Sequence, residues 1–174
     1  MSSSSLIVFD TKVVDDFYRN YICNPSLLQI YEANGFSPAG TVHFRTWEVF
    51  ASQIIGETRK PGNGSDFASY EVKSAVKGNS FEYQYHKNTG IEKLEEDMQV
   101  SHMFMSYSPN YSEVSIRVVP ASQLKPFFES WKSGLAVAYG DDNPKQRYRR
   151  SIPYGTVQKL GTEILAFKDG LRVQ

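Results

Sequence analysis

Residues 61–75 carry side chains whose types and spacing suit chemistry on a phosphodiester. A glycine-rich turn at residues 62–65 leads into an alternating stretch that contains Glu71 and Lys73. Successive side chains of a strand point to opposite faces, so these two share a face and Val72 points to the other. In phosphodiester hydrolysis a carboxylate holds a divalent cation, while an adjacent lysine orients a water and offsets charge on the phosphate. The stretch therefore predicts a metal-dependent hydrolytic site.

Two more acids stand near this stretch. Asp66 directly follows the turn and is the expected second metal ligand, and Glu57 either supports the site from behind or replaces Asp66. A surface acid is the alternative interpretation of Glu57. Asp66 and Glu71 are separated by four residues, and on one regular strand they would point to opposite faces. A bend over residues 67–69 must therefore bring the two carboxylates together.

The acid-x-lysine pattern by itself is weak. A chain of this size and composition contains roughly one such tripeptide by chance. This chain contains a second one, Asp10-Thr11-Lys12, which no upstream acid supports. The alternative interpretation of Glu71 and Lys73 is an exposed ion pair worth about 0 to 1 kcal/mol.

Two polar segments carry groups that bind nucleic acids. Residues 81–88 offer aromatic, amide, imidazole and amine groups in a loop or strand end, and such groups reach base edges or phosphates. Residues 141–150 include four basic side chains within six positions, which would neutralise phosphates from a loop. An exposed strand and a solvated charged loop are the alternatives. The expected DNA-contacting residues are Tyr85, His86, Lys87, Asn88, Asn143, Lys145, Arg147, Arg149 and Arg150.

Bulk properties favour one cytoplasmic domain. The 174 residues, 40% of them apolar, are enough for one buried core, and the net charge of zero does not exclude a local basic strip. The single cysteine, Cys23, forms neither an internal disulfide nor a zinc site, which fits a reducing compartment. No apolar run approaches the roughly 20 residues of a membrane span, and the polar start lacks the basic region of a signal peptide.

Apolar spacing predicts the elements that would position these groups. Helices are expected as two short pieces within 13–33, then over 47–55, 91–98 and 124–131, the last capped by Ser122 and ended by Gly134. Strands are expected over 70–76 and as a hairpin of 101–107 with 113–119. Residues 156–160 suit a short helix or a strand, while 135–140 are ambiguous. His102 is expected to be a structural histidine.

In this order the segments resemble the PD-(D/E)xK nucleases, and among them the small type II restriction endonucleases of the PvuII kind. The resemblance covers about residues 50–165 and implies a mixed α/β (α+β) fold, with a restriction-endonuclease-like core whose central mixed β-sheet is flanked by helices. Residues 1–174 would form a single nuclease domain. The matching motifs are Gly64-Ser65-Asp66, Tyr70-Glu71-Val72-Lys73-Ser74, the hairpin, Phe127-Phe128-Glu129-Ser130-Trp131-Lys132, Asn143-Pro144-Lys145, Ile152-Pro153 and Gly161-Thr162.

The resemblance also implies roles for single residues. Asp66 and Glu71 would bind Mg²⁺, the Val72 carbonyl would be a further ligand, and Lys73 would assist the attacking water. The family reads bases with adjacent histidines after the catalytic strand. The matching positions here are Tyr85 and His86, so one of them departs from the pattern. A base-reading asparagine before proline and lysine is matched by Asn143.

The implied activity is that of a homodimeric, Mg²⁺-dependent endonuclease that cuts both strands of duplex DNA at a short palindrome and leaves 5′-phosphates. The first forty residues match poorly, and residues 1–45 are expected to form a helical dimerisation region. A cognate DNA methyltransferase would protect host sites. The alternatives are a homing, repair or junction-resolving nuclease on the same core, or a non-catalytic DNA-binding module.

Overall fold

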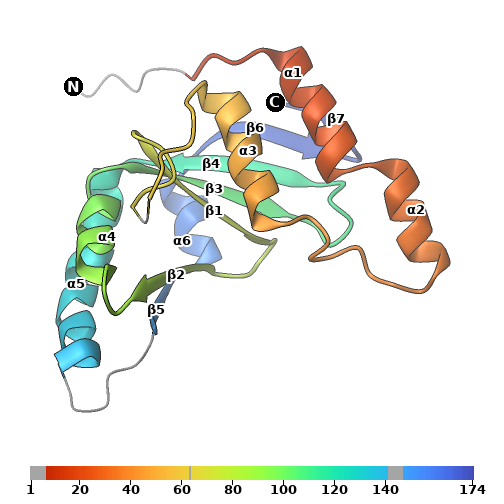
Figure 1. Cartoon of the computed structure of the whole chain (residues 1–174). Helices are drawn as coiled ribbons and strands as arrows, with labels where there is room; N and C mark the ends of the chain where they lie inside the picture. The colour runs from red at the N-terminus through yellow and green to blue at the C-terminus, as the bar shows by residue number, and fades with distance from the viewer. Residues whose placement is uncertain (1–6, 63, 141–146) are drawn as a thin grey trace.

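A five-stranded sheet forms the centre of the molecule, with helices on both faces (Figure 1). The computed structural model describes residues 7–62, 64–140 and 147–174, and its strand order is β1-β3-β4-β6-β7. β1 runs parallel to β3 and the remaining pairs are antiparallel. The predicted central mixed sheet flanked by helices is thus confirmed. The strands are β1 (Tyr70–Val76), β3 (Ser101–Tyr107), β4 (Val114–Val119), β6 (Thr162–Lys168) and β7 (Leu171–Arg172).

Several helices begin or end at capping residues. Asn24 accepts a hydrogen bond from the Leu27 N–H at 3.1 Å, with Pro25 at the first helical position. Gly56 ends its helix in the left-handed region, at φ 72°. The helices are α1 (Thr11–Phe17), its π-helical continuation η1 (Tyr18–Ile22), α2 (Pro25–Ala33), α3 (Phe44–Ile55), α4 (Gly90–Asp97), α5 (Ala121–Gly140) and α6 (Tyr154–Leu160).

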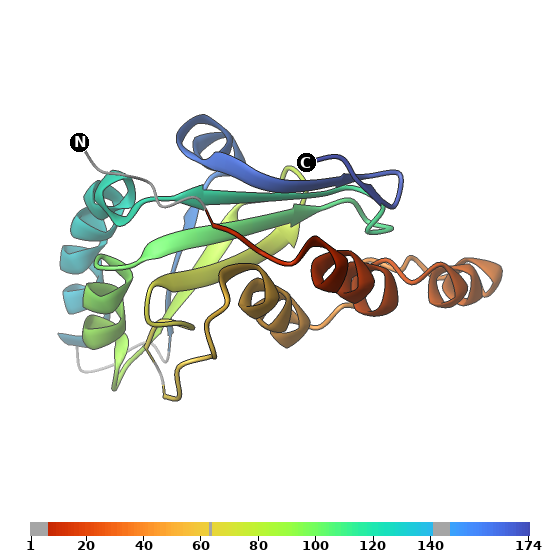
Figure 2. The same cartoon turned by 90° about the horizontal axis from the view of Figure 1, so that it is seen from above.

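Alternation along the strands divides the buried side chains into two cores. Val72, Met103 and Ile116 pack with α1, η1 and α3 on one face of the sheet. Phe104 and Val119 point to the other face, where they pack with α4, α5 and α6. Figure 2 shows α1 and α3 on one side of the sheet and α6 on the other. The helices on both faces therefore hold β1 and its neighbours rigidly from either side.

A second, two-stranded sheet consists of β2 (Phe81–His86) and β5 (Arg147–Ile152), which pair antiparallel. The expectation that Arg147 to Arg150 belong to a charged loop is therefore wrong. Tyr148 and Ile152 of β5 point into the core beneath this two-stranded ribbon, β2–β5. The charged residues between and around them conceal this strand pattern in the sequence. Asn143 and Lys145, expected to contact DNA, lie outside the described residues.

α5 was expected to end at Gly134. In the structure it continues to Gly140. Trp131 and Leu135 are buried on both sides of the glycine, and this burial holds the helix together. A Cβ at Gly134 would overlap the Tyr148 hydroxyl, so the glycine allows β5 to approach α5 closely. None of the helices in the described part of the chain combines the length and apolar character that a membrane crossing requires.

Gly134→Ala is expected to destabilise the protein, because the added methyl overlaps the Tyr148 hydroxyl and overpacking of this kind costs about 1 to 3 kcal/mol. This loss outweighs the gain of about 1 kcal/mol that alanine brings to a helix interior. Tyr148→Phe in the same background removes the overlapping oxygen and should restore part of the stability. Urea unfolding measures both, with Gly155→Ala in α6 as control, where no described side chain lies within 4 Å. Equal stabilities of Gly134→Ala and wild type would contradict this packing.

Candidate active site at the open edge of strand β1

Glu71 and Lys73 share the face of β1 that is turned toward α4 and β2, as their spacing predicts. The Lys73 ammonium lies 2.7 Å from Glu71 Oε1, and the side chains are only 18% and 2% exposed. Lys73 also lies over the Tyr83 ring of β2, at 4.7 Å from its centroid. The alternative of an exposed ion pair is therefore wrong. A largely buried pair keeps a fixed geometry, which a reacting site needs.

The bend needed to bring Asp66 to Glu71 is present. The Phe67 N–H donates to the Tyr70 carbonyl at 2.9 Å, which folds the segment back toward β1. Asp66 Oδ2 then accepts from the Val72 N–H at 3.0 Å, and the Asp66 N–H donates to Glu71 Oε2 at 3.1 Å. Both carboxylates therefore meet at the edge of β1, although one regular strand would have separated them.

The Val72 carbonyl lies on this same edge. Among the strands that the structure describes, β1 is the outer strand of the sheet and pairs with β3. The N–H and C=O of an extended residue point to the same side of the strand, and the Val72 N–H points to Asp66. The carbonyl is therefore directed away from β3, toward the side that Asp66 occupies.

The two carboxyl groups differ in their affinity for protons. Burial, followed by the charge of Glu71, raises the pKa of Asp66 to about 6. Burial also acts to raise the pKa of Glu71, but Lys73 and Lys93 lower it by more, to about 2. Glu71 is thus fully charged at neutral pH, whereas Asp66 holds its charge only weakly.

Lys93 of α4 is a second ammonium at Glu71, and the sequence interpretation missed it. Its Nζ lies 2.9 Å from Glu71 Oε1, 3.2 Å from Asp97 Oδ1 and 3.3 Å from the Gly64 carbonyl. Burial acts to lower the pKa of Lys93, but Glu71 and Asp97 raise it above the usual value. The only sequence signal was the spacing of Lys93 and Asp97, which puts them on one face of a helix.

Asp97 is fully buried and is contacted by the side chains of Tyr85 and His102. The Tyr85 hydroxyl donates to Asp97 Oδ2 at 2.9 Å, and His102 Nε2 lies 2.7 Å from the Asp97 carbonyl. The Tyr83 hydroxyl lies 2.7 Å from His102 Nδ1. Burial lowers the pKa of His102 to about 4, so this histidine is neutral and structural, as expected. Tyr85, expected to read DNA bases, instead points into the core, because its hydroxyl satisfies Asp97.

Of the acids upstream, the one that approaches Asp66 is Glu48 rather than Glu57. Glu57 Oε2 accepts from the Ser69 N–H at 3.2 Å and so supports the bend. Glu48 on α3 binds Arg59 at 2.8 Å, and the same guanidinium lies 4.0 Å from Asp66 Oδ1. The sequence did not single out Glu48, since its position on α3 gives no indication of a neighbour in the bend.

The polar face of the β2–β5 ribbon carries several of the side chains expected to bind DNA. Cross-strand pairing puts Gln84 opposite Arg149 and His86 opposite Arg147, and the Arg147 guanidinium donates to Gln84 Oε1 at 3.2 Å. Arg150 points to the other face, where its Nε donates to the Tyr148 hydroxyl at 2.6 Å. Of the members of the expected set that the structure describes, the exposed ones are His86, Lys87, Asn88, Arg147, Arg149 and Arg150.

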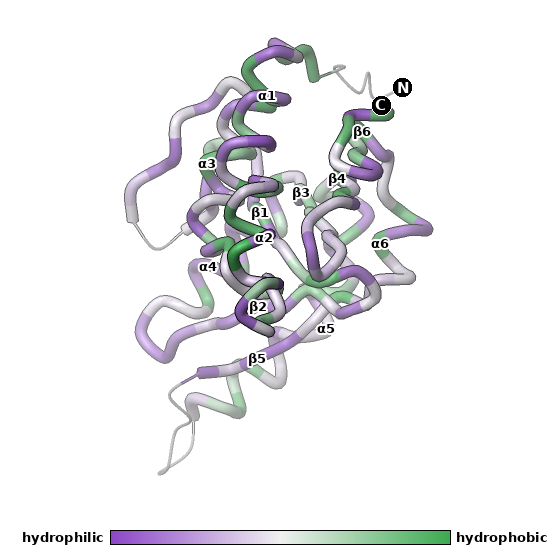
Figure 3. The backbone as a smooth tube through the Cα atoms, turned by 90° about the vertical axis from the view of Figure 1, so that its right-hand side faces the viewer, coloured by the Kyte–Doolittle hydropathy of each residue, from purple (hydrophilic) through white to green (hydrophobic). Residues whose placement is uncertain are grey.

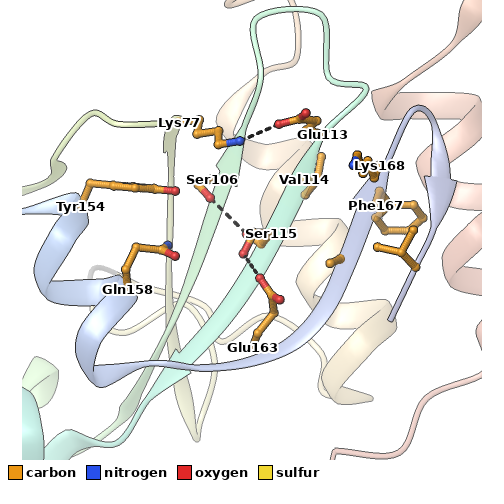
Figure 4. Close-up of a pocket in the computed structure, with 12 residues that line it drawn as sticks. Lys77, Ser106, Glu113, Val114, Ser115, Tyr154, Gln158, Glu163, Phe167 and Lys168 are labelled. Atoms are coloured by element: carbon orange, nitrogen blue, oxygen red, sulfur yellow. Dashed lines mark hydrogen bonds and ion pairs between the residues drawn. The ribbon is translucent and has the colours of Figure 1, made fainter.

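A separate polar groove of about 390 Å³ lies on the face of the sheet next to α6 (Figure 4). Its Lys77 and Glu113 neutralise each other at 2.6 Å. Its Glu163 accepts from Ser115 and pairs with Arg117 at 3.3 Å. Each of these acids is paired with a basic side chain, whereas at the edge of β1 burial and the charge of a second carboxylate, Glu71, raise the pKa of Asp66.

The donors at the edge of β1 fit a magnesium ion. Among the described residues no group of three or more His, Cys, Asp or Glu side chains that could hold a metal is found. Magnesium, however, keeps several waters and is commonly bound by one or two carboxylates together with substrate phosphates. Asp66, Glu71 and the Val72 carbonyl supply donors of this kind. Comparison with models of protein families and with curated proteins gives no match, so the function rests on the site itself.

Proposed function

We propose that this protein is a magnesium-dependent type II restriction endonuclease, which makes sequence-specific double-strand breaks in DNA. One observation carries the proposal. Two carboxylates meet at an open strand edge beside the Lys73 ammonium, and the pKa of one of them, Asp66, is raised to about 6 by burial and by the other. Carboxylates crowded in this way repel each other until a cation joins them.

Each residue has a distinct task in this proposal. Asp66, Glu71 and the Val72 carbonyl would hold Mg²⁺, which polarises a phosphate oxygen as a Lewis acid when it is bound. Lys73 orients the attacking water and offsets the negative charge that builds up on the phosphate. Glu71 fixes the Lys73 ammonium at 2.7 Å, and the Tyr83 ring limits its movement from the other side. The Glu71 carboxylate and the Lys73 ammonium are thereby held in position before DNA binds.

The β2–β5 ribbon is the proposed DNA-reading element. A major groove admits a two-stranded ribbon, and arginine and glutamine side chains pair with base edges there. Arg147, Arg149, Gln84 and His86 share the exposed face of the ribbon. The buried face of the same ribbon contacts the candidate site, where the Tyr83 ring lies against the Lys73 ammonium. Recognition and cleavage would thus be connected through β2.

The proposal includes a homodimer, since a two-fold protein matches the two half-sites of a palindrome. α2 lies at one end of the molecule, away from the sheet, and has no buried residue (Figure 2). Several apolar residues of α2 and of the segments beside it are exposed, and hydrophobic positions colour parts of the α2 tube green in Figure 3. The exposed apolar residues of this region are Tyr21, Leu27, Ile30, Phe36 and Phe44. A DNA methyltransferase that protects host sites would be the cellular partner.

Digestion of a supercoiled plasmid of known sequence with purified protein and Mg²⁺ tests the proposal. Discrete fragments with 5′-phosphate ends are the expected result. Cleavage of branched or damaged DNA alone would replace it with a repair or junction-resolving nuclease. DNA binding without cleavage in Mg²⁺ or Mn²⁺ would favour a non-catalytic module, in which the two lysines on Glu71 are merely structural ion pairs.

Cleavage should weaken as the pH falls below about 6, the raised pKa of Asp66. Above that pH the carboxylate is charged and binds Mg²⁺, while below it a proton competes for the same oxygens. The Mg²⁺ concentration for half-maximal cleavage is therefore expected to rise about tenfold per pH unit on the acidic side. Rates measured over a Mg²⁺ series at several pH values give this number. A half-maximal concentration that does not change across pH 6 would contradict the role of Asp66.

A further inference from the structure

Glu71 lies within a row of alternating charges that crosses from β1 to α4. Lys73 and Lys93 both contact its Oε1 atom, at 2.7 and 2.9 Å. Lys93 in turn contacts Asp97 Oδ1 at 3.2 Å. The other carboxylate oxygen of Glu71, Oε2, faces the Asp66 backbone instead. One oxygen of Glu71 therefore binds two ammonium groups, and the other accepts from the backbone N–H of Asp66, the residue that carries the second carboxylate.

Lys93 is held in place by more than Glu71. It donates to the Gly64 carbonyl at 3.3 Å, in the turn that carries Asp66. Its side chain is only 17% exposed, and Asp97 behind it is fully buried. Moving the ammonium away would leave the Asp97 charge without its cation in the interior, which costs several kcal/mol. The ammonium is thus a permanent part of the site.

Many phosphodiesterases hold two divalent ions about 4 Å apart, with a shared carboxylate between them. Here Lys93 lies on the shared carboxylate, on the side opposite Asp66. We propose that the Lys93 ammonium takes the place of a second metal ion, so that the site binds one divalent cation, between Asp66 and Glu71. This inference rests on the proposed function, because it concerns the metal of that same site.

The charges of the site agree with a single ion. The carboxylates of Asp66, Glu71 and Asp97 exceed the ammonium groups of Lys73 and Lys93 by one charge. One divalent ion leaves a single positive charge, which matches one phosphate of the DNA backbone. A second ion would need the position beside Glu71 Oε1 that the Lys93 ammonium occupies at 2.9 Å, and two cations at that position would repel each other.

Calorimetric titration with Ca²⁺, confirmed by Mn²⁺ binding in electron paramagnetic resonance, tests the inference at neutral pH. The wild-type protein is expected to bind one ion per chain. The double variant Lys93→Met with Asp97→Asn removes one charge of each sign, keeps an acceptor for the Tyr85 hydroxyl, and is expected to bind two. Lys93→Arg keeps the cation and should bind one. Asp97→Asn alone also keeps Lys93 and should bind one.

The outcomes separate the inference from the proposed function. Two ions per wild-type chain would overturn the inference whether or not the variants fold. So would a folded double variant, with a cooperative thermal transition, that still binds one ion. If the wild-type protein cuts plasmid DNA in either case, the proposed function survives. A wild-type protein that binds neither ion and cuts no DNA would overturn both.

Discussion

Lys73→Ala and Asp66→Asn are each expected to abolish Mg²⁺-dependent DNA cleavage while leaving a folded protein that binds DNA. Lys73→Ala removes the group that orients the water and offsets phosphate charge, and loss of one such group typically costs about 100- to 1,000-fold in rate. Asp66→Asn removes a charged metal ligand and keeps the shape of the side chain. Single-turnover cleavage of plasmid DNA measures both losses.

The structure explains why these variants should fold. Without Lys73, Glu71 still has Lys93 at 2.9 Å, so its buried charge keeps a cation. With asparagine at position 66, the side-chain oxygen can still accept from the Val72 N–H. Lys77→Ala, which removes an exposed lysine paired with Glu113, is the matched control and should cut at the wild-type rate. Cleavage that persists in Lys73→Ala or Asp66→Asn would show that the assignment of that residue is wrong.

Asp97→Ala is expected to lower the free energy of unfolding by about 3 to 5 kcal/mol at neutral pH, because it leaves the Lys93 ammonium without half of its buried counter-charge. It also removes the acceptor of the Tyr85 hydroxyl, which is itself buried. Burial, followed by the Glu71 charge, raises the pKa of Asp97 to about 6, so the group is still ionised at neutral pH. Urea denaturation monitored by tryptophan fluorescence gives the free energy.

Glu95→Ala is the matched control for this measurement. Glu95 lies on the same helix but is exposed, so its loss should change stability by less than about 0.5 kcal/mol. Asp97→Asn should cost less than Asp97→Ala, since the amide oxygen can still accept from Tyr85. If Asp97→Ala and Glu95→Ala unfold at the same urea concentration, the buried network around Lys93 contributes nothing to stability.

Local patterning was enough to predict most of the elements. The period of two over residues 70–76 put Glu71 and Lys73 on one face, and β1 confirms this. The helix that ends at Gly56 and the hairpin of β3 with β4 are confirmed for the same reason. In each case the side chains that determine the element are neighbours in sequence, so their spacing alone reports the period of the backbone.

Other features follow from contacts between distant segments. Gly134 was expected to end a helix. In the structure it lies inside α5, where the absence of a side chain leaves room for the hydroxyl of Tyr148 on β5. Tyr85 stood in a polar run, but its hydroxyl is bound to Asp97 of α4. Residues 147–150 were expected to belong to a charged loop, but they pair with β2 and form part of strand β5. Their local sequences fit either outcome, and packing decided between them.

The sequence by itself determined that Glu71 and Lys73 face the same way, because the period of a strand requires it. Whether Asp66 reaches them depended on a bend held by hydrogen bonds from Phe67 and Val72, and these exist only in the folded chain. The contact between Lys93 and Glu71 depended on how α4 packs against β1. Tertiary structure alone decided it, since burial of the surrounding apolar residues sets the distance between two segments that are 22 positions apart.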